Sequence, residues 1–162
     1  MRLSDGVEWA IHCCTVLAFV PPDGALPASA LAEFHEVPPA YLAKHLQSLS
    51  RAGIVEAVPG PKGGYRLGRP PAEVSLLDIV LAVEGAEPAF RCTEIRQRGP
   101  AAMPERAYRL PCAIARAMWD AEEAWRDSLA GTSVADVVVS LGETVSPKAA
   151  AKAAAWFSEV VR

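Results

Sequence analysis

The feature that most constrains this fold is a pair of helical segments that meet at a pair of prolines. In residues 26–55, apolar residues recur at helical spacing on both sides of the sequence HEVPP, residues 35–39. Proline suits the first position of a helix, so the second helix is expected to begin near Pro39. Gly53, which tolerates the left-handed backbone of a helix C-terminus, is expected to end it. Two helices joined by so short a turn predict a helix-turn-helix.

The residues that follow predict a β-hairpin. Residues 54–58 and 65–68 have strand composition and flank the turn-forming sequence PGPKGG. Because the hairpin comes directly after the second helix, the segment is expected to be a winged helix-turn-helix. Further helices are expected over residues 5–20 after Ser4, over 76–84 between Ser75 and Gly85, and over the C-terminal third. The expected fold is mainly α-helical with a small β wing.

The long helix after residue 112 carries a seam of apolar residues at alternating spacings of four and three. Its members are Ile114, Met118, Ala121 and Trp125, followed by Ser128 or Leu129. Such a heptad-like seam suits pairing with a partner helix, so we expect a dimerisation helix and a homodimer. Packing within one chain is the alternative.

The charge distribution favours nucleic-acid binding by one face. Between residues 40 and 71, five basic residues accompany a single acid, Glu56, giving a local charge of +4. The net charge of −3 leaves −7 for the remainder of the chain. A basic helix and wing on an acidic body favour contact with DNA phosphates. The alternative is a winged helix that contacts protein, with its charges merely solvated.

In a helix-turn-helix, the second helix enters the major groove with its N-terminal residues nearest the bases. Gln can pair with adenine and Lys with guanine, whereas Arg51 and Lys62 are better suited to phosphates. The expected partner is a double-stranded DNA operator. The residues expected to contact DNA are Pro39, Ala40, Tyr41, Lys44, His45, Gln47, Ser48, Arg51, Lys62 and Arg66.

No run approaches the ~20 apolar residues that a membrane span needs, so no membrane partner is expected. Asp5 and Glu8 precede the apolar stretch near the N-terminus, and Pro21 and Pro22 follow it where a signal peptide would have a cleavage site. These features favour a cytoplasmic protein whose cysteines stay reduced.

The sequence G-x-x-G-G-Y-x-L-x-R-P from Gly60 to Pro70, followed by LLDIV, resembles the wing and following helix of the IscR/NsrR/RsrR family (Rrf-type) of bacterial transcription regulators. The resemblance extends over about residues 1–140. It implies a regulator rather than an enzyme, a homodimer with a long crossing helix, and binding to roughly palindromic operators. It also implies an iron–sulfur cluster, which many members of the family carry and whose state sets operator affinity.

The sequence EWAIHCC, residues 8–14, offers several donors for such a site. Adjacent residues on a helix diverge by ~100°, so Cys13 and Cys14 are not expected to converge on one metal. Cys14 lies on the apolar stripe and is interpreted as packing, and packing also explains Cys13. Glu8 and His12 share one face, one turn apart. Their alternatives are a dipole partner for Glu8 and a partly buried helix histidine for His12.

The motif around Glu8, Trp9 and His12, together with FRCTEIRQRGP around Cys92, resembles the RsrR-like subgroup of the family. In that subgroup a 2Fe-2S cluster is bound by two loop cysteines of one subunit and a glutamate and a histidine of the other. The resemblance implies Glu8, His12, Cys92 and Cys112 as ligands, with one cluster per subunit and two per dimer. The loop departs from the commoner cluster-binding members, which have three cysteines there.

These observations predict a homodimeric, DNA-binding transcription regulator whose operator affinity is switched by the redox state of a 2Fe-2S cluster. Trp9, next to a ligand, is expected to relay that state to the helix-turn-helix. The alternatives are a cluster-free regulator that senses thiols or small molecules, and a zinc-dependent enzyme with Glu8 as base, for which we see no substrate-pocket signature. The expected segments are a DNA-binding domain (1–85), a cluster-binding loop (86–112), and the dimerisation helix with C-terminal helices (113–162).

Overall fold

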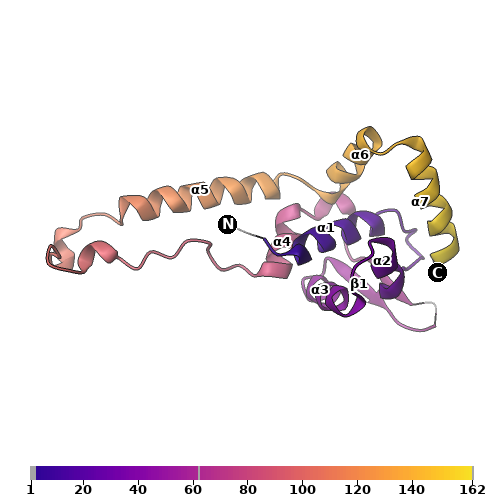
Figure 1. The fold of residues 1–162 in the computed structure, drawn as a ribbon, viewed down its shortest axis with the longest axis horizontal. Coiled ribbons are helices and arrows are strands. Elements are labelled where there is room, and N and C mark those ends of the chain that lie inside the picture. The colour runs from indigo at the N-terminus through magenta and orange to yellow at the C-terminus, as the bar shows by residue number, and fades with distance from the viewer. Residues whose placement is uncertain (1–2, 62, 162) are drawn as a thin grey trace. The chain divides into compact units, whose positions relative to one another are not determined.

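The computed structural model describes residues 3–61 and 63–161 (Figure 1). Their elements are α1 (Asp5–Leu17), α2 (Ala28–Phe34), α3 (Pro39–Arg51), β1 (Val55–Val58), β2 (Gly64–Leu67), η1 (Pro71–Glu73), α4 (Leu76–Glu84), η2 (Ile95–Gln97), η3 (Glu105–Ala107), α5 (Ala113–Ala130), α6 (Val134–Thr144) and α7 (Pro147–Val160). Within the described residues, no helix is both long enough and apolar enough to cross a membrane. The chain divides into two compact units: residues 86–128, the loop–α5 unit, and the rest of the described chain, the winged-helix unit.

The helix-turn-helix is formed by α2 and α3. As predicted, α3 begins at Pro39, and Gly53 follows its last turn with a φ of +68°. The N–H of Ile54 donates to the carbonyl of Leu49 at 3.0 Å and closes the helix end. A positive φ is costly for residues with a Cβ, which explains the glycine at this position.

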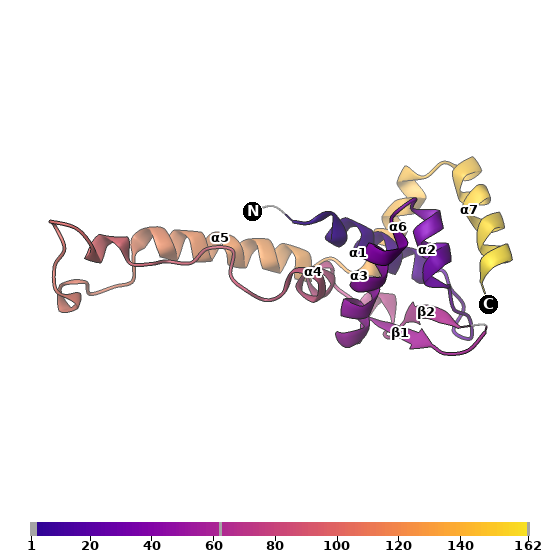
Figure 2. The same cartoon turned by 60° about the horizontal axis from the view of Figure 1, so that its bottom comes forward.

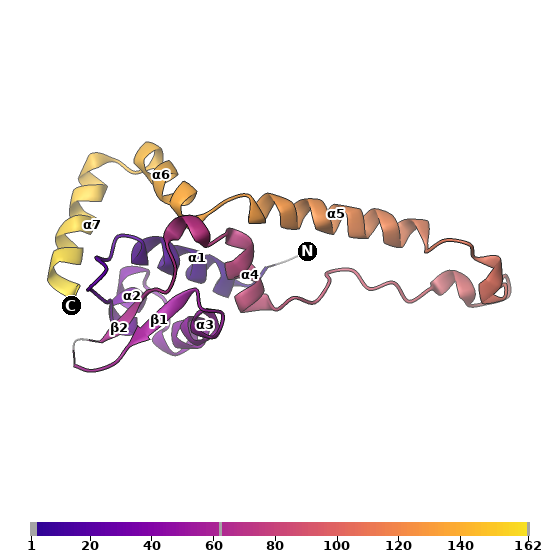
Figure 3. The same cartoon turned by 180° about the vertical axis from the view of Figure 1, so that it is seen from behind.

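The wing is an antiparallel hairpin that lies beside α3 (Figure 3), in which Val55 pairs with Leu67 and Val58 with Gly64. Its second strand is also bridged to the residue before the helix-turn-helix. The N–H of Leu26 donates to the carbonyl of Tyr65 at 2.9 Å, and the reverse bond measures 2.8 Å. A Cβ at Gly64 would collide with the backbone of Leu26, so this bridge needs a glycine. The predicted fold, mainly helical with a small β wing, is confirmed.

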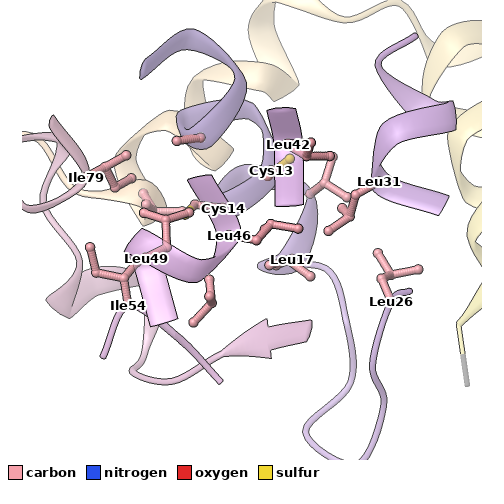
Figure 4. Packing of buried hydrophobic residues seen from close by; sticks show 14 of the residues in the cluster. Cys13, Cys14, Leu17, Leu26, Leu31, Leu42, Leu46, Leu49, Ile54 and Ile79 are labelled. Atoms are coloured by element: carbon pink, nitrogen blue, oxygen red, sulfur yellow. The ribbon is translucent and has the colours of Figure 1, made fainter. Parts of the chain in front are cut away.

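The core of the winged-helix unit lies between α1, α2, α3 and α4 (Figure 4). Cys13 and Cys14 are both 0% exposed within it, so the expectation that Cys14 is packing holds, and Cys13 is packing too. Burial raises the pKa of Cys13 to about 12 and raises the pKa of Cys14 as well. Both thiols therefore stay protonated and are poor candidates for metal binding. The largest fully buried side chains include Leu17, Leu26, Leu31, Leu42, Leu46, Leu49, Ile54 and Ile79.

Serine side chains fix several helix ends. Ser75 and Ser133 form capping boxes with Asp78 and Asp136, three residues into α4 and α6. Ser4 occupies the predicted N-cap position of α1, but its hydroxyl makes no capping bond. Instead, its N–H and hydroxyl both donate to the carboxylate of Glu84, at 2.9 and 2.5 Å. Ser4 therefore ties the start of α1 to the end of α4.

The C-terminal helix α7 packs on the helix-turn-helix through aromatic side chains. The ring of Phe34, at the end of α2, lies 4.8 Å from that of Trp156 and 5.5 Å from that of Phe157, measured between centroids. Phe157 also lies near Phe19, at 6.4 Å. Helix α7 therefore supports the first helix of the helix-turn-helix, which its alanine-rich sequence did not reveal.

In the loop–α5 unit, residues 86–112 run antiparallel to α5 (Figures 1 and 2). The N–H of Ala89 donates to Glu122 of α5 at 3.0 Å, and Arg126 pairs with the same carboxylate at 2.7 Å. The residues predicted to form a partner-facing seam include Ile114 and Met118, which are 68% and 44% exposed. Since α6 and α7 belong to the winged-helix unit, the predicted segment 113–162 is shared between the two units.

Candidate functional site

The first half of the predicted metal site lies on the exposed face of α1. Glu8 and His12 are both exposed and share one face, one turn apart. They border a hollow of about 410 Å³. The other residues that line the hollow are Leu3, Ser4, Asp5, Val7 and Ile11. A carboxylate and an imidazole are therefore open to a ligand beside an apolar floor.

A second histidine lies close to His12. The ring of His35, in the turn after α2, lies 5.4 Å from the ring of His12 between centroids. Its Nε2 is buried, and no residue in the described part of the chain bonds to it. Burial lowers the pKa of His35, and the nearby His12 lowers it further. The neutral form of His35 is thus favoured. In the sequence, nothing but its position in the HEVPP turn distinguishes this histidine.

The second half of the predicted site is the pair Cys92 and Cys112. Both are free thiols, and the N–H of Glu94 donates to the Sγ of Cys92 at 3.4 Å. Arg96 is the largest cause of the lowered pKa of the Glu94 carboxyl, and the backbone N–H of Cys112 and the thiol of Cys92 lower it as well. Both predicted cysteine ligands therefore influence one carboxyl, although 19 residues separate them in the sequence.

Arg96 holds that carboxylate in place. Its Nε lies 2.7 Å from an oxygen of Glu94, and an Nη donates to the carbonyl of Leu110 at 2.8 Å. The guanidinium stacks 4.6 Å from the centre of the Tyr108 ring, whose hydroxyl donates to the Arg96 carbonyl at 2.8 Å. No sequence pattern points to Glu94, Arg96 and Tyr108, because irregular segments have no periodicity that would identify them.

The surroundings of Cys112 favour its thiolate. The backbone N–H groups of Ala115 and Ile114, in the first turn of α5, lower the pKa of Cys112, and Arg96 lowers it further; burial and Glu94 act in the opposite direction. A thiolate is the form that binds metals and reacts with oxidants. The pKa of Cys112 is therefore lowered, whereas burial raises the pKa values of Cys13 and Cys14.

The two halves belong to different compact units of the chain. Among residues 3–61 and 63–161, no three His, Cys, Asp or Glu side chains come together to hold a metal ion. One chain therefore presents two pairs of donors, Glu8 with His12 on α1 and Cys92 with Cys112 in the loop–α5 unit.

Trp9 links α1 to the recognition helix α3. Its half-buried ring meets the ring of His45 edge-on, at 6.0 Å between centroids and an interplanar angle of 77°. On its other side His45 lies against the backbone of Gly6, where a Cβ would come within 2.5 Å of Nε2. Desolvation and Lys44 lower the pKa of His45, although Glu84 opposes them. His45, one of the residues predicted to contact DNA, thus turns its ring toward α1.

The other predicted DNA contacts on α3 form a continuous face opposite its buried leucines. Tyr41, near the N-terminus of α3, is 64% exposed. The face combines an aromatic ring, an amide and two cations, which are groups suited to base edges and phosphates. Its exposed members are Pro39, Ala40, Tyr41, Lys44, Gln47 and Arg51, with Ser48 half-buried beside them.

The basic residues of the wing are less available than their number suggested. Arg66 forms an ion pair with Glu56 at 3.0 Å and donates to the carbonyl of Pro22 at 2.8 Å. Arg69 lies 3.5 Å from Asp78. Lys62 lies outside the described residues. Among the described residues of the predicted DNA face, the exposed positive charge therefore rests mainly on Lys44 and Arg51 of α3.

Comparisons with known proteins show similarity to regulators of transcription. The model of the Rrf2 family, described as an iron-dependent transcriptional regulator, matches residues 3–140. A putative HTH-type transcriptional regulator of Lactococcus lactis, YffB, is 31% identical over 137 residues, covering 85% of this chain and 86% of its own length. The regulator IscR of Aliivibrio salmonicida is 30% identical over 92 residues, covering 57% and 55%.

Two solved structures have the same fold. T. potens IscR superposes with a TM-score of 0.67 at 20% identity, covering 90% of this chain and 92% of its own. CymR, the global cysteine regulator of B. subtilis, gives 0.66 at 22% identity, covering 86% and 97%. These relatives are regulators of transcription, so the chain is not an enzyme, and the zinc-dependent reaction considered from the sequence is discarded.

Proposed function

We propose a specific role for this chain, which belongs to the Rrf2 family of transcription regulators. It is a homodimeric, redox-responsive repressor or activator that carries a 2Fe-2S cluster. The proposed ligands are Glu8, His12, Cys92 and Cys112. The observation that carries the proposal is the contrast between the four cysteines. Cys13 and Cys14 are buried in the core, whereas Cys92 and Cys112 are half-buried in the loop–α5 unit and both lower the pKa of the Glu94 carboxyl.

The donor set suits such a cluster. Two thiolates, one imidazole and one carboxylate supply four terminal ligands, and imidazole ligation raises the reduction potential of 2Fe-2S centres. When bound, the cluster supplies a reversible one-electron change of charge. Glu8 and His12 are exposed and border a hollow, so no rearrangement of the core is needed for either to bind.

Homodimer formation follows from the apolar surface of α5. Ile114 and Met118 are exposed and lie four residues apart on one helix face, with Trp119 beside them at 42% exposure. A second copy of α5 would cover these side chains. In the dimer, the two donors of α1 and the two cysteines of the loop can come from different subunits, as in the subgroup that the sequence resembles.

We further propose that α3 enters the major groove of the operator. Tyr41, Lys44 and Gln47 are then the residues that face bases, and Arg51 contacts phosphate. Two such helices in a homodimer would read a roughly palindromic site. Arg66, already paired with Glu56, contributes less charge to this surface than the unpaired side chains of α3.

Trp9 is the proposed relay between cluster and operator. It follows the ligand Glu8 directly, and its ring meets His45 of α3. A change of charge at Glu8 and His12 that shifts the ring of Trp9 therefore acts on the recognition helix through His45. Because the packed interior between α1 and α3 is dense, a small displacement at Trp9 is transmitted rather than absorbed.

The test uses Trp9→Ala in protein purified without oxygen. A DNA duplex is first selected from a random-sequence pool with the wild-type protein, and its binding to oxidised and dithionite-reduced protein is then compared by fluorescence anisotropy. The wild type should bind with different affinities in the two states. Trp9→Ala should keep the visible absorbance of the cluster and lose that difference. Phe19→Ala, an exposed aromatic beyond the other end of α1, is the control and should keep it.

A cluster-free thiol sensor of the same fold is the second candidate. The observation in its favour is the lowered pKa of Cys112, which lies outside the core of the winged-helix unit. This candidate predicts iron-free protein whose DNA binding responds to hydrogen peroxide, with the response lost in Cys112→Ala. Unchanged redox dependence in Trp9→Ala would reject the relay, whereas absence of iron would reject the cluster.

A further inference from the structure

We infer that Glu94, Arg96 and Tyr108 form a clasp that holds Cys92 and Cys112 together as a dithiol before any metal binds, and that Arg96 is its positioning residue. The inference deepens the proposed function, since the cluster is what the dithiol would bind. It concerns only residues of the loop–α5 unit, so it does not depend on how a second subunit is placed.

The clasp joins the two ends of the loop by direct bonds. Arg96 lies near Cys92 in sequence, yet it donates to the carbonyl of Leu110, two residues before Cys112. The carboxylate of Glu94 pairs with Arg96 at 2.7 Å, and the N–H of Glu94 donates to the Sγ of Cys92 at 3.4 Å. Arg96 therefore spans the loop, and Glu94 links it to Cys92.

Tyr108 completes the clasp from the opposite side. Its ring lies under the guanidinium of Arg96, and its hydroxyl donates to the Arg96 carbonyl while accepting from the N–H of Met103 at 3.2 Å. The loop segment on both sides of η3 is thereby attached to Arg96. Closing a loop of this length costs chain entropy, and the network offsets that cost without a metal.

The backbone of Glu94 has an unusual conformation in this arrangement. Its φ is +49°, in the left-handed region that residues with a Cβ seldom occupy. This conformation accompanies the bond from its own N–H to the Sγ of Cys92. A strained residue of this kind persists only where surrounding contacts hold it, and here those contacts are with Arg96 and Cys92.

Arginine is required at this position for a geometric reason. A planar guanidinium can bond a carboxylate and a carbonyl in its plane while an aromatic ring stacks on its face. A lysine ammonium carries the same charge but cannot make these contacts together. Replacement by lysine should therefore fail to restore the clasp, which separates a positioning role from a simple effect of charge.

The experiment measures whether the two thiols can be bridged in the full-length protein without metal. Phenylarsine oxide reacts with a close pair of thiols, forming two As–S bonds and releasing one water molecule. The reduced protein is treated with this reagent in excess 2-mercaptoethanol, which reverses attachment to single thiols. Intact-mass spectrometry then gives the fraction that retains one phenylarsenic group. Cys92→Ser should retain none, and this establishes which thiols are bridged.

The two thiols of the wild type should be bridged by the reagent. Arg96→Gln and Arg96→Lys should each lower the apparent affinity for the reagent about tenfold, which is the size of effect expected when a charge-assisted contact is lost. Arg98→Gln is the matched control. Arg98 lies in the same loop and donates to the carbonyl of Thr93 at 3.0 Å, and its substitution should leave the affinity within about twofold. Far-ultraviolet circular dichroism should be unchanged in all of them.

Equal bridging of Arg96→Gln and the wild type would overturn the inference, and so would a wild type that is not bridged. Rescue by Arg96→Lys would overturn the geometric role of the guanidinium. If the wild type is bridged but never takes up iron, the cluster proposal fails while the clasp stands. The two proposals can therefore fail separately.

Discussion

The contact between Gly6 of α1 and His45 of α3 yields the sharpest stability prediction. A Cβ built on Gly6 would lie within 2.5 Å of Nε2 and 2.9 Å from Nδ1 of His45, well inside van der Waals contact. The ring cannot simply swing away, since Trp9 meets it on the adjacent side. Gly6→Ala must therefore displace the ring, the helix or both.

The magnitude combines two opposing effects. Overpacking of a close contact costs about 1–3 kcal/mol. Alanine is favoured over glycine within a helix by about 1 kcal/mol. The expected result for Gly6→Ala is a net loss of about 1–2 kcal/mol in the free energy of unfolding. Gly142, in α6, is the matched control, because a Cβ there meets nothing within 4 Å. Gly142→Ala should stabilise by up to about 1 kcal/mol.

The assay is urea unfolding of the metal-free protein, followed by circular dichroism at one protein concentration, since dimerisation links stability to concentration. A second mutation isolates the contact. In a His45→Ala background, Gly6→Ala should become neutral or stabilising, giving a coupling free energy of about 1–3 kcal/mol. If Gly6→Ala stabilises the protein as much as Gly142→Ala does, the ring of His45 does not lie against α1, and the proposed relay loses its path.

Three further predictions concern other parts of the chain. Trp156→Ala removes the ring that packs on Phe34 and should lower the free energy of unfolding by about 2 kcal/mol. Lys152→Ala, on the exposed side of α7, should change it by less than about 0.5 kcal/mol, and thermal unfolding distinguishes the two variants. Cys14→Ser places a hydroxyl in an apolar site and should cost about 2 kcal/mol in urea unfolding, more than Cys14→Ala. Arg51→Ala should weaken DNA binding similarly across sequences and reduce the slope of log affinity against log salt by about 1.

The sequence predicted those parts of the fold that rest on local chemistry. Pro39 and Gly53 delimit α3, and Ser75 caps α4, as their backbone preferences require. Ser4 shows the limit of such reasoning. In a cap, the serine oxygen accepts from a backbone N–H of the helix, but here the hydroxyl of Ser4 donates to the ionised carboxylate of Glu84, 80 residues away, and makes no capping bond.

The candidate site likewise contains some residues that local sequence patterns predict and others that only tertiary contacts reveal. Helical spacing was enough to expect Glu8 and His12 on one face and to separate them from Cys14. The clasp around Arg96 could not be foreseen, because contacts within an irregular loop follow from tertiary folding alone. The same holds for the inward turn of His45, which helical spacing left among the DNA contacts. The local charge of +4 already subtracts Glu56, the partner of Arg66, but it leaves out Asp78, which lies beyond residue 71 and pairs with Arg69.

The most direct test of the central claim is the iron and acid-labile sulfide content of the protein after purification without oxygen. We predict about one 2Fe-2S cluster per subunit, with a visible absorbance that dithionite bleaches. Cys112→Ala and His12→Ala should lose iron and sulfide together, while Cys13→Ala should retain both. Iron-free or zinc-containing wild-type protein would contradict the claim, as would equal loss of the cluster in Cys13→Ala.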